Sequence, residues 1–327
     1  MSLTALLLGR RLANQEAEAR KIGAIEGLPA MGLDGLGSAS YGPEAMLTVL
    51  AVSGTAGLAA VQPITWVILA LLAILFVSYW QTIAAYPNNG GCYTVAQENL
   101  GETAALFAAA ALMVDYMLNV AVGISAGVGA LTSAIPGLHT YTLPLCLGIL
   151  VAITLVNLRG TRESGLILAI PTYLFIVTLF FILAAGAWAA WASGGHPQPV
   201  VAPPKASTAA GAVTIWLVLR AFAAGCTAMT GVEAVSNGVG AFKGPTVKYA
   251  HRTVAALCAV LGLLLLGIAY LAHSYGVMAM DQSAGNYQSV LSQLVAAVWG
   301  RGWLYFVTIG SVPVSYTHLT LPTTPYV

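Results

Sequence analysis

Seven long apolar runs constrain this chain more than any other feature, because a membrane-spanning helix needs roughly 20 mostly apolar residues. Soluble domains carry about 25% charged residues, whereas this 327-residue chain has 7%. The sequence therefore predicts an all-α, polytopic transmembrane helix bundle. The predicted spans are residues 28–52, 64–85, 104–133, 141–158, 166–191, 211–240 and 254–275, with a partial eighth from Trp303.

The basic residues predict the orientation. With a cytoplasmic N-terminus, nine Lys and Arg residues fall inside and two, Lys205 and Arg301, fall outside. Such a bias is typical of the positive-inside rule. The inside set is Arg10, Arg11, Arg20, Lys21, Arg159, Arg162, Lys243, Lys248 and Arg252.

Several function classes are disfavoured by composition. A net charge of +1 gives no reason to expect a nucleic-acid partner. The four cysteines lie far apart and no histidine pair has metal-ligand spacing, so neither a structural metal nor a cofactor is expected.

The segments outside the spans have distinct compositions. Residues 1–27 read as a cytoplasmic tail without a cleavable signal, and residues 193–210 as a Pro-rich extracellular loop. Residues 287–299 are expected to form an amphipathic helix on the outer surface. The Thr- and Pro-rich residues 315–327 resemble translated cloning sequence and are expected to be non-native.

Glycine and proline interrupt two of the apolar runs. A break is predicted in span one at Gly35, Gly37, Gly42 and Pro43, and another in span six at Gly231 and Gly238. Discontinuous helices mark the binding sites of transporters. Because the two breaks are five spans apart, they suggest two five-helix repeats. The alternative is that these glycines only allow close helix packing.

Five ionisable groups fall inside predicted spans: Asp34, Glu44, Asp115, Arg220 and Glu233. Each costs at least ~2.5 kcal/mol at membrane depth unless paired or hydrated. Four acids against one base leave a surplus of negative charge, which indicates a cavity that binds a cation or relays a proton. An Arg220–Asp115 salt bridge that holds helices in register is the structural alternative.

The run Gly123 to Gly127 matches the G-x-S-x-G pattern of serine hydrolases around Ser125. That pattern needs a strand, a sharp turn and a helix, whereas here it lies inside a long span without a nearby histidine. Close helix packing explains it better than an intramembrane hydrolase, and a purely structural membrane subunit fits poorly with the interrupted helices.

Several motifs resemble the amino acid, polyamine and organocation superfamily of permeases. The segment PNNGGCY, residues 87–93, is similar to the P-x-x-G-G-x-Y signature between helices two and three. The blocks LDGLGSASYGPEA, DYMLNVAVGISAG, NLRGTRESG and TGVEAVSNGV look closest to its KUP-type potassium importers and to amino acid permease-like relatives.

The resemblance implies a LeuT-type inverted five-helix repeat. Residues 28–192 would form the first repeat, and residues 211–314 an incomplete second one. It also implies that a longer transporter is needed for activity, so that this chain alone is not expected to transport.

The same resemblance implies roles for individual residues. Potassium or substrate would be bound by Asp34, Tyr41, Asp115, Tyr116 and Thr230, with Glu233 coupling the proton. Asn119 stands where the importers carry a hydroxyl residue, and it still offers a carbonyl oxygen. Gly123 replaces a second hydroxyl residue and offers no ligand.

The implied function is secondary active transport, with proton-coupled potassium uptake as the first reading and proton-coupled amino acid import as the alternative. The implied partners are a small ion or small molecule, protons and the lipid bilayer, and a homodimer is left open. The expected location is the plasma membrane.

The charge bias gives a direct test of topology. Single cysteines placed beside Arg159 and Lys243 should react with an impermeant reagent only from the cytoplasmic side, because both positions belong to the basic side. Labelling of both sites from outside would reverse the predicted orientation.

Overall fold

The computed structural model describes residues 21–87, 91–157, 161–204 and 211–315, and within these the secondary structure is helical apart from one isolated β-bridge. The first half contains α3 (Ala24–Met31), α4 (Leu33–Leu50), η1 (Ala51–Ser53), α5 (Thr55–Ala85), α6 (Cys92–Leu100), α7 (Glu102–Ala134), η2 (Pro136–Tyr141), α8 (Thr142–Asn157) and α9 (Thr161–Ala192). The second half contains α10 (Ile215–Gly225), η3 (Cys226–Met229), α11 (Ala234–Asn237), η4 (Val239–Ala241), α12 (Thr246–Tyr275), α13 (Val290–Trp299) and α14 (Trp303–Ser315).

Six helical segments are long and apolar enough to cross a membrane, in agreement with the predicted helical bundle. They correspond to predicted spans two to seven. The first predicted span is made by α3 and α4 together, and α14 is the short eighth. The α4 helix is less apolar because it carries glycine, serine and acidic residues, and most of these are buried among other helices.

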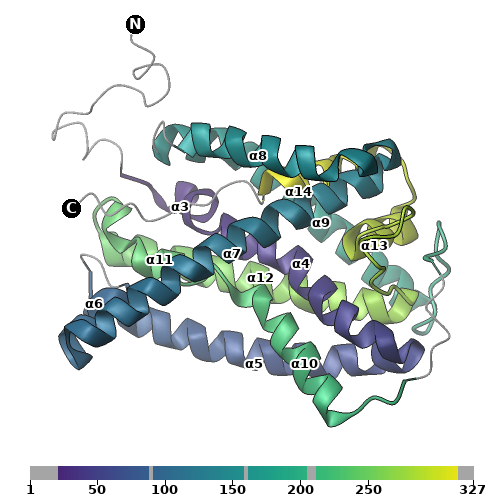
Figure 1. Ribbon diagram of the computed structural model, residues 1–327, viewed down its shortest axis with the longest axis horizontal. Helices are drawn as coiled ribbons and strands as arrows, with labels where there is room; N and C mark the ends of the chain where they lie inside the picture. Colours follow the sequence, from purple (N-terminus) through teal and green to yellow (C-terminus); the bar gives the residue numbers. More distant parts are fainter. Residues whose placement is uncertain (1–20, 88–90, 158–160, 205–210, 316–327) are drawn as a thin grey trace, which may run out of the picture.

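The bundle has a protein-covered centre and a lipid-facing edge. Half of the residues in the most apolar stretch of α12 are buried, against 6% for Pro136–Leu155. In Figure 1, α4 and α12 run through the middle, with α8 along one edge and α5 along the opposite one. The contacts agree, since α12 packs on α5, α4 and α9 while α10 packs on α4. Spans one and seven therefore form the centre of the bundle.

The predicted break in span one is wrong in its position. The helix is interrupted at Gly32, between α3 and α4, and α4 then runs unbroken through Gly35, Gly37, Gly42 and Pro43. A proline inside a membrane helix is tolerated where neighbouring groups surround the freed backbone.

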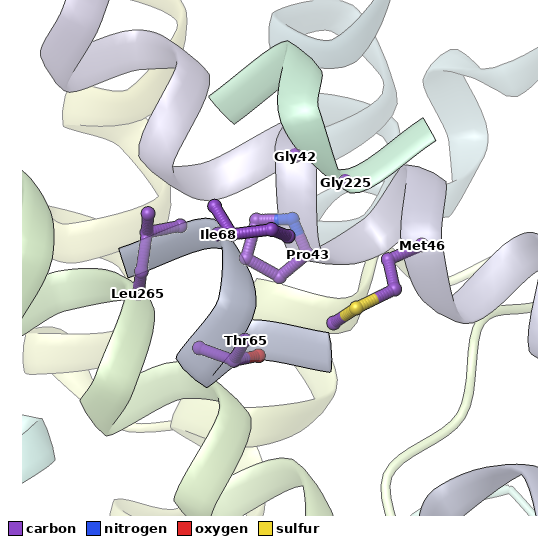
Figure 2. A pocket seen from close by; sticks show the side chains of 7 residues that line it. All are labelled: Gly42, Pro43, Met46, Thr65, Ile68, Gly225 and Leu265. Carbon is purple, nitrogen blue, oxygen red and sulfur yellow. The ribbon is translucent and has the colours of Figure 1, made fainter. Parts of the chain in front are cut away.

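Figure 2 shows the surroundings of the Pro43 ring, which faces a small apolar pocket between α4, α5, α10 and α12. The pocket is lined by Gly42, Pro43, Met46, Thr65, Ile68, Gly225 and Leu265. The proline is therefore enclosed by protein and keeps its helical conformation.

Glycines of α4 serve close packing. A Cβ on Gly42 would overlap the Cβ of Ala228 and lie 2.8 Å from its Cα. The backbone of α4 therefore touches η3 directly, as expected where small residues let membrane helices approach.

Span six is interrupted over a long segment. The α10 helix ends at Gly225, the chain tightens into η3, and the short α11 follows only after the turn at Thr230 to Glu233. Gly231 has a φ of +86°, a conformation that L-residues rarely adopt. Gly238 separates α11 from η4.

A β-bridge joins the beginning of span one to the end of span six. The Ile22 amide donates to the Ala241 carbonyl at 2.9 Å, and the Lys243 amide donates to the Ile22 carbonyl at 3.0 Å. The Ile22 and Phe242 side chains are both buried. The segment before α3 is therefore held against the segment that follows η4.

The predicted surface helix is also corrected. The α13 helix forms at the expected place, but Val290 to Ala297 are all buried, including Ser292 and Gln293. It packs against α14, α12, α9, α7 and α4. Most of the predicted N-terminal tail, part of the Pro-rich loop and nearly all of the predicted non-native tail lie outside the described residues.

The α4–η3 contact predicts a stability difference between two glycines. Gly42→Ala should destabilise the fold by ~1–3 kcal/mol, because overpacking at a closed contact costs about that much. Gly148→Ala on α8 is the matched control, since nothing lies within 4 Å of its added Cβ. Thermal unfolding in detergent should show a lower Tm for the Gly42 variant only, and equal Tm values would contradict the packing role.

Candidate cation-binding site

The centre of the site is a contact between α4 and α7. Asp34 lies in the first turn of α4, and its Oδ1 accepts a hydrogen bond from Asn119 Nδ2 at 2.5 Å. Asn119 is buried on the inner face of α7. The amide donor therefore satisfies one oxygen of a half-buried carboxyl group.

Two hydroxyl groups complete the cluster around Asn119. Tyr41 lies two turns after Asp34 on α4, and its Oη donates to Asn119 Oδ1 at 2.5 Å. The same Oη lies 3.2 Å from Thr230 Oγ1, and either atom can donate. Thr230 Oγ1 is also 3.4 Å from Asn119 Oδ1. Asp34, Tyr41, Asn119 and Thr230 thus form one hydrogen-bonded network across spans one, three and six.

Ser38 joins this network and was not singled out from the sequence. Its Oγ lies within hydrogen-bond reach of three carbonyl oxygens, those of Gly35 at 2.8 Å, Ala228 at 3.0 Å and Thr230 at 3.1 Å. It therefore links α4 to backbone carbonyls at the break in span six. The signal was available, since Ser38 lies four residues after Asp34, on the same face of the helix.

Glu233 is the last residue of the turn in span six. Its Oε1 accepts a hydrogen bond from the Gly231 amide at 3.2 Å. A Cβ on Gly231 would lie 2.7 Å from Asp34 Cγ and 2.6 Å from the Gly35 amide nitrogen. Gly231 therefore separates the carboxyl groups of Asp34 and Glu233, which are close enough for their charges to interact.

Tyr116 belongs to a neighbouring contact. It is buried on α7, and its Oη accepts from Asn237 Nδ2 at 2.9 Å. Gly91, from the PNNGGCY segment, lies against the same asparagine, because an added Cβ would be 2.9 Å from Asn237 Oδ1. The described part of that segment thus packs against α11 in span six. Residues 88–90 lie outside the described residues.

Asp115 is not part of the network. Its side chain is exposed, although it lies only one turn before the buried Asn119 on α7. Arg220 is exposed on α10, and these two described side chains form no salt bridge with each other. The alternative of an Arg220–Asp115 register pair is therefore wrong.

The chemistry of the cluster is that of a site for a hard cation. It presents a carboxylate, two hydroxyls, an amide oxygen and nearby backbone carbonyls. Within the described part of the chain, no Lys, Arg or His side chain forms an ion pair with Asp34 or Glu233. Buried charges need a partner, so this acidic pair is suited to neutralisation by a cation and a proton.

Comparison with known proteins identifies the family of the chain. The family model described as amino acid permease matches residues 35–317. The chain is also 40% identical over 309 residues to the potassium transporter KimA of Bacillus subtilis strain 168. That alignment covers 94% of this chain and 50% of the relative, so the chain spans about half the length of the curated relative.

Proposed function

Because the chain belongs to the amino acid permease family of multi-pass membrane proteins, we propose that it carries the cation site of a proton-coupled potassium importer. The potassium transporter among its relatives supports this substrate. The charge bias supports a cytoplasmic N-terminus, and a location in the plasma membrane is part of the same proposal.

The observation that carries the proposal is the oxygen-rich network around Asp34. Potassium is bound in proteins by oxygen atoms that replace its hydration shell. Tyr41 Oη, Thr230 Oγ1 and Asn119 Oδ1 lie within hydrogen-bond distance of one another, and Asn119 ties them to Asp34. In this arrangement the Asn119 amide donates to Asp34 Oδ1. A cation that binds through this oxygen therefore competes with the amide donor.

Glu233 is the proposed proton-coupling residue. It adds a second carboxyl group beside the first without a basic partner among the described residues. Two neighbouring carboxylates repel each other, so binding of a cation at one changes the proton affinity of the other. This gives a physical route by which cation binding and proton binding depend on each other.

Amino acid import remains the alternative because the matching family is described as amino acid permease. Such a substrate needs free backbone amides for its carboxylate. The Gly231 amide, however, already donates to Glu233, and Asp34 lies directly beside it. A carboxylate placed there would meet two acidic groups, which favours a cation instead.

Potassium binding by the purified chain in nanodiscs tests the assignment. Replacing choline chloride by potassium chloride at constant ionic strength should raise the Tm, because a ligand that binds the folded state stabilises it. Asp34→Asn should abolish most of this rise, whereas Asp281→Asn, in an exposed loop, should keep it. An unchanged potassium effect in Asp34→Asn, or stabilisation by amino acids alone, would contradict the proposal.

A second variant separates binding from coupling. Glu233→Gln should retain the potassium-dependent rise in Tm. In liposomes that contain the longer transporter with the same substitution, an inward proton gradient should no longer accelerate potassium uptake. Gradient-driven accumulation by the Gln variant would refute the role of Glu233. The family resemblance also implies a role for Asp115, so Asp115→Asn should reduce uptake. Because Asp115 is exposed and Asp34 lies within the network, Asp34→Asn should reduce uptake more.

A further inference from the structure

Glu44 is the buried acid that the proposed site does not use. It lies ten residues after Asp34 on α4, about 15 Å further along the helix at the usual rise per residue. Only 8% of its surface is exposed. Its Oε1 accepts a hydrogen bond from Tyr287 Oη at 2.5 Å, and its Oε2 accepts one from the Val290 amide at 3.3 Å. Both donors belong to the segment that leads into α13.

The same segment is fixed to α7 on its other side. The Ser289 amide donates to Ser133 Oγ at 2.9 Å. Tyr287 also packs on α7, because a Cβ on Gly129 would lie 3.3 Å from its ring. Residues 287–290 are therefore inserted between α4 and α7, and α13 lies at the same end of the bundle as the C-terminal ends of both helices (Figure 1).

These contacts lie on the same helix pair that builds the site. At one level α4 and α7 meet through Asp34, Tyr41 and Asn119. At the next level they are bridged by residues 287–290 through Glu44 and Ser133. Asn119 and Ser133 are fourteen residues apart on α7, which places them on nearly the same helix face.

We propose that Glu44 is a positioning residue that anchors residues 287–290 between α4 and α7 and thereby keeps the outer side of the Asp34 site closed. This rests on the proposed function and orientation. Two separate donors converge on one buried carboxylate, and one of them, the Val290 amide, is the first amide of α13. Hydrogen bonds to a charged group are stronger than those between neutral groups. Loss of an acceptor oxygen at Glu44 therefore weakens the anchor.

The test is the reactivity of a cysteine at position 126 in a background without the four native cysteines. Ala126 lies seven residues from both Asn119 and Ser133, so it faces the same side of α7 between the site and the anchor. Labelling by an impermeant thiol reagent is measured separately from each side of oriented proteoliposomes, in choline chloride. Glu44→Gln replaces one of the two acceptor oxygens by an amide nitrogen, and Tyr287→Phe removes one donor while leaving the carboxyl group.

Both variants should be labelled from outside at least about tenfold faster than the parent, in line with the loss of a hydrogen bond to a charged group. Labelling from inside should not change. Glu98→Gln, an exposed acid on α6, is the matched control and should behave as the parent. Parental outside rates in both anchor variants would overturn the proposal. Equal acceleration from both sides would also overturn it, because it would indicate general loosening. Since no potassium is present, the result is independent of whether potassium binds at Asp34.

Discussion

The direct backbone contact between α4 and the interrupted sixth span positions the groups that these two spans contribute to the candidate site. Gly42 allows α4 to touch Ala228, and Gly231 allows the turn of span six to lie against Asp34. Ser38 then reaches the carbonyl oxygens of Ala228 and Thr230. A side chain at either glycine would separate the two segments. The network with Asn119 would then lose the hydroxyl of Thr230.

Much of this arrangement could be predicted from the sequence because the membrane penalises polar groups so strongly. The charge surplus inside apolar spans points to Asp34, and the family resemblance adds Tyr41, Asn119 and Thr230. The structure brings these four side chains together. The position of the first break could not be predicted in this way. Pro43 is a strong helix breaker in isolation, but the surrounding helices enclose it, and the chain breaks at Gly32 instead.

Other differences have the same origin, since sequence patterns do not show which neighbours cover a helix. Asp115 is on the exposed face of α7, although it stands only one turn before Asn119. The apolar and polar residues of α13 suggested a surface helix, yet both kinds are buried by five neighbouring helices. Glu44 was recognised as a buried charge, but its partners Tyr287 and Val290 lie more than 240 residues away in the chain.

A bound cation should replace the Asn119 amide at Asp34 Oδ1. An experimental structure of the protein in rubidium or thallium, which scatter strongly and substitute for potassium, tests this most directly. We expect a cation surrounded by the oxygens of Asp34, Tyr41, Asn119 and Thr230, with the Asn119 amide nitrogen turned away from Asp34. A saturating cation bound elsewhere, with the Asn119–Asp34 hydrogen bond intact, would contradict it.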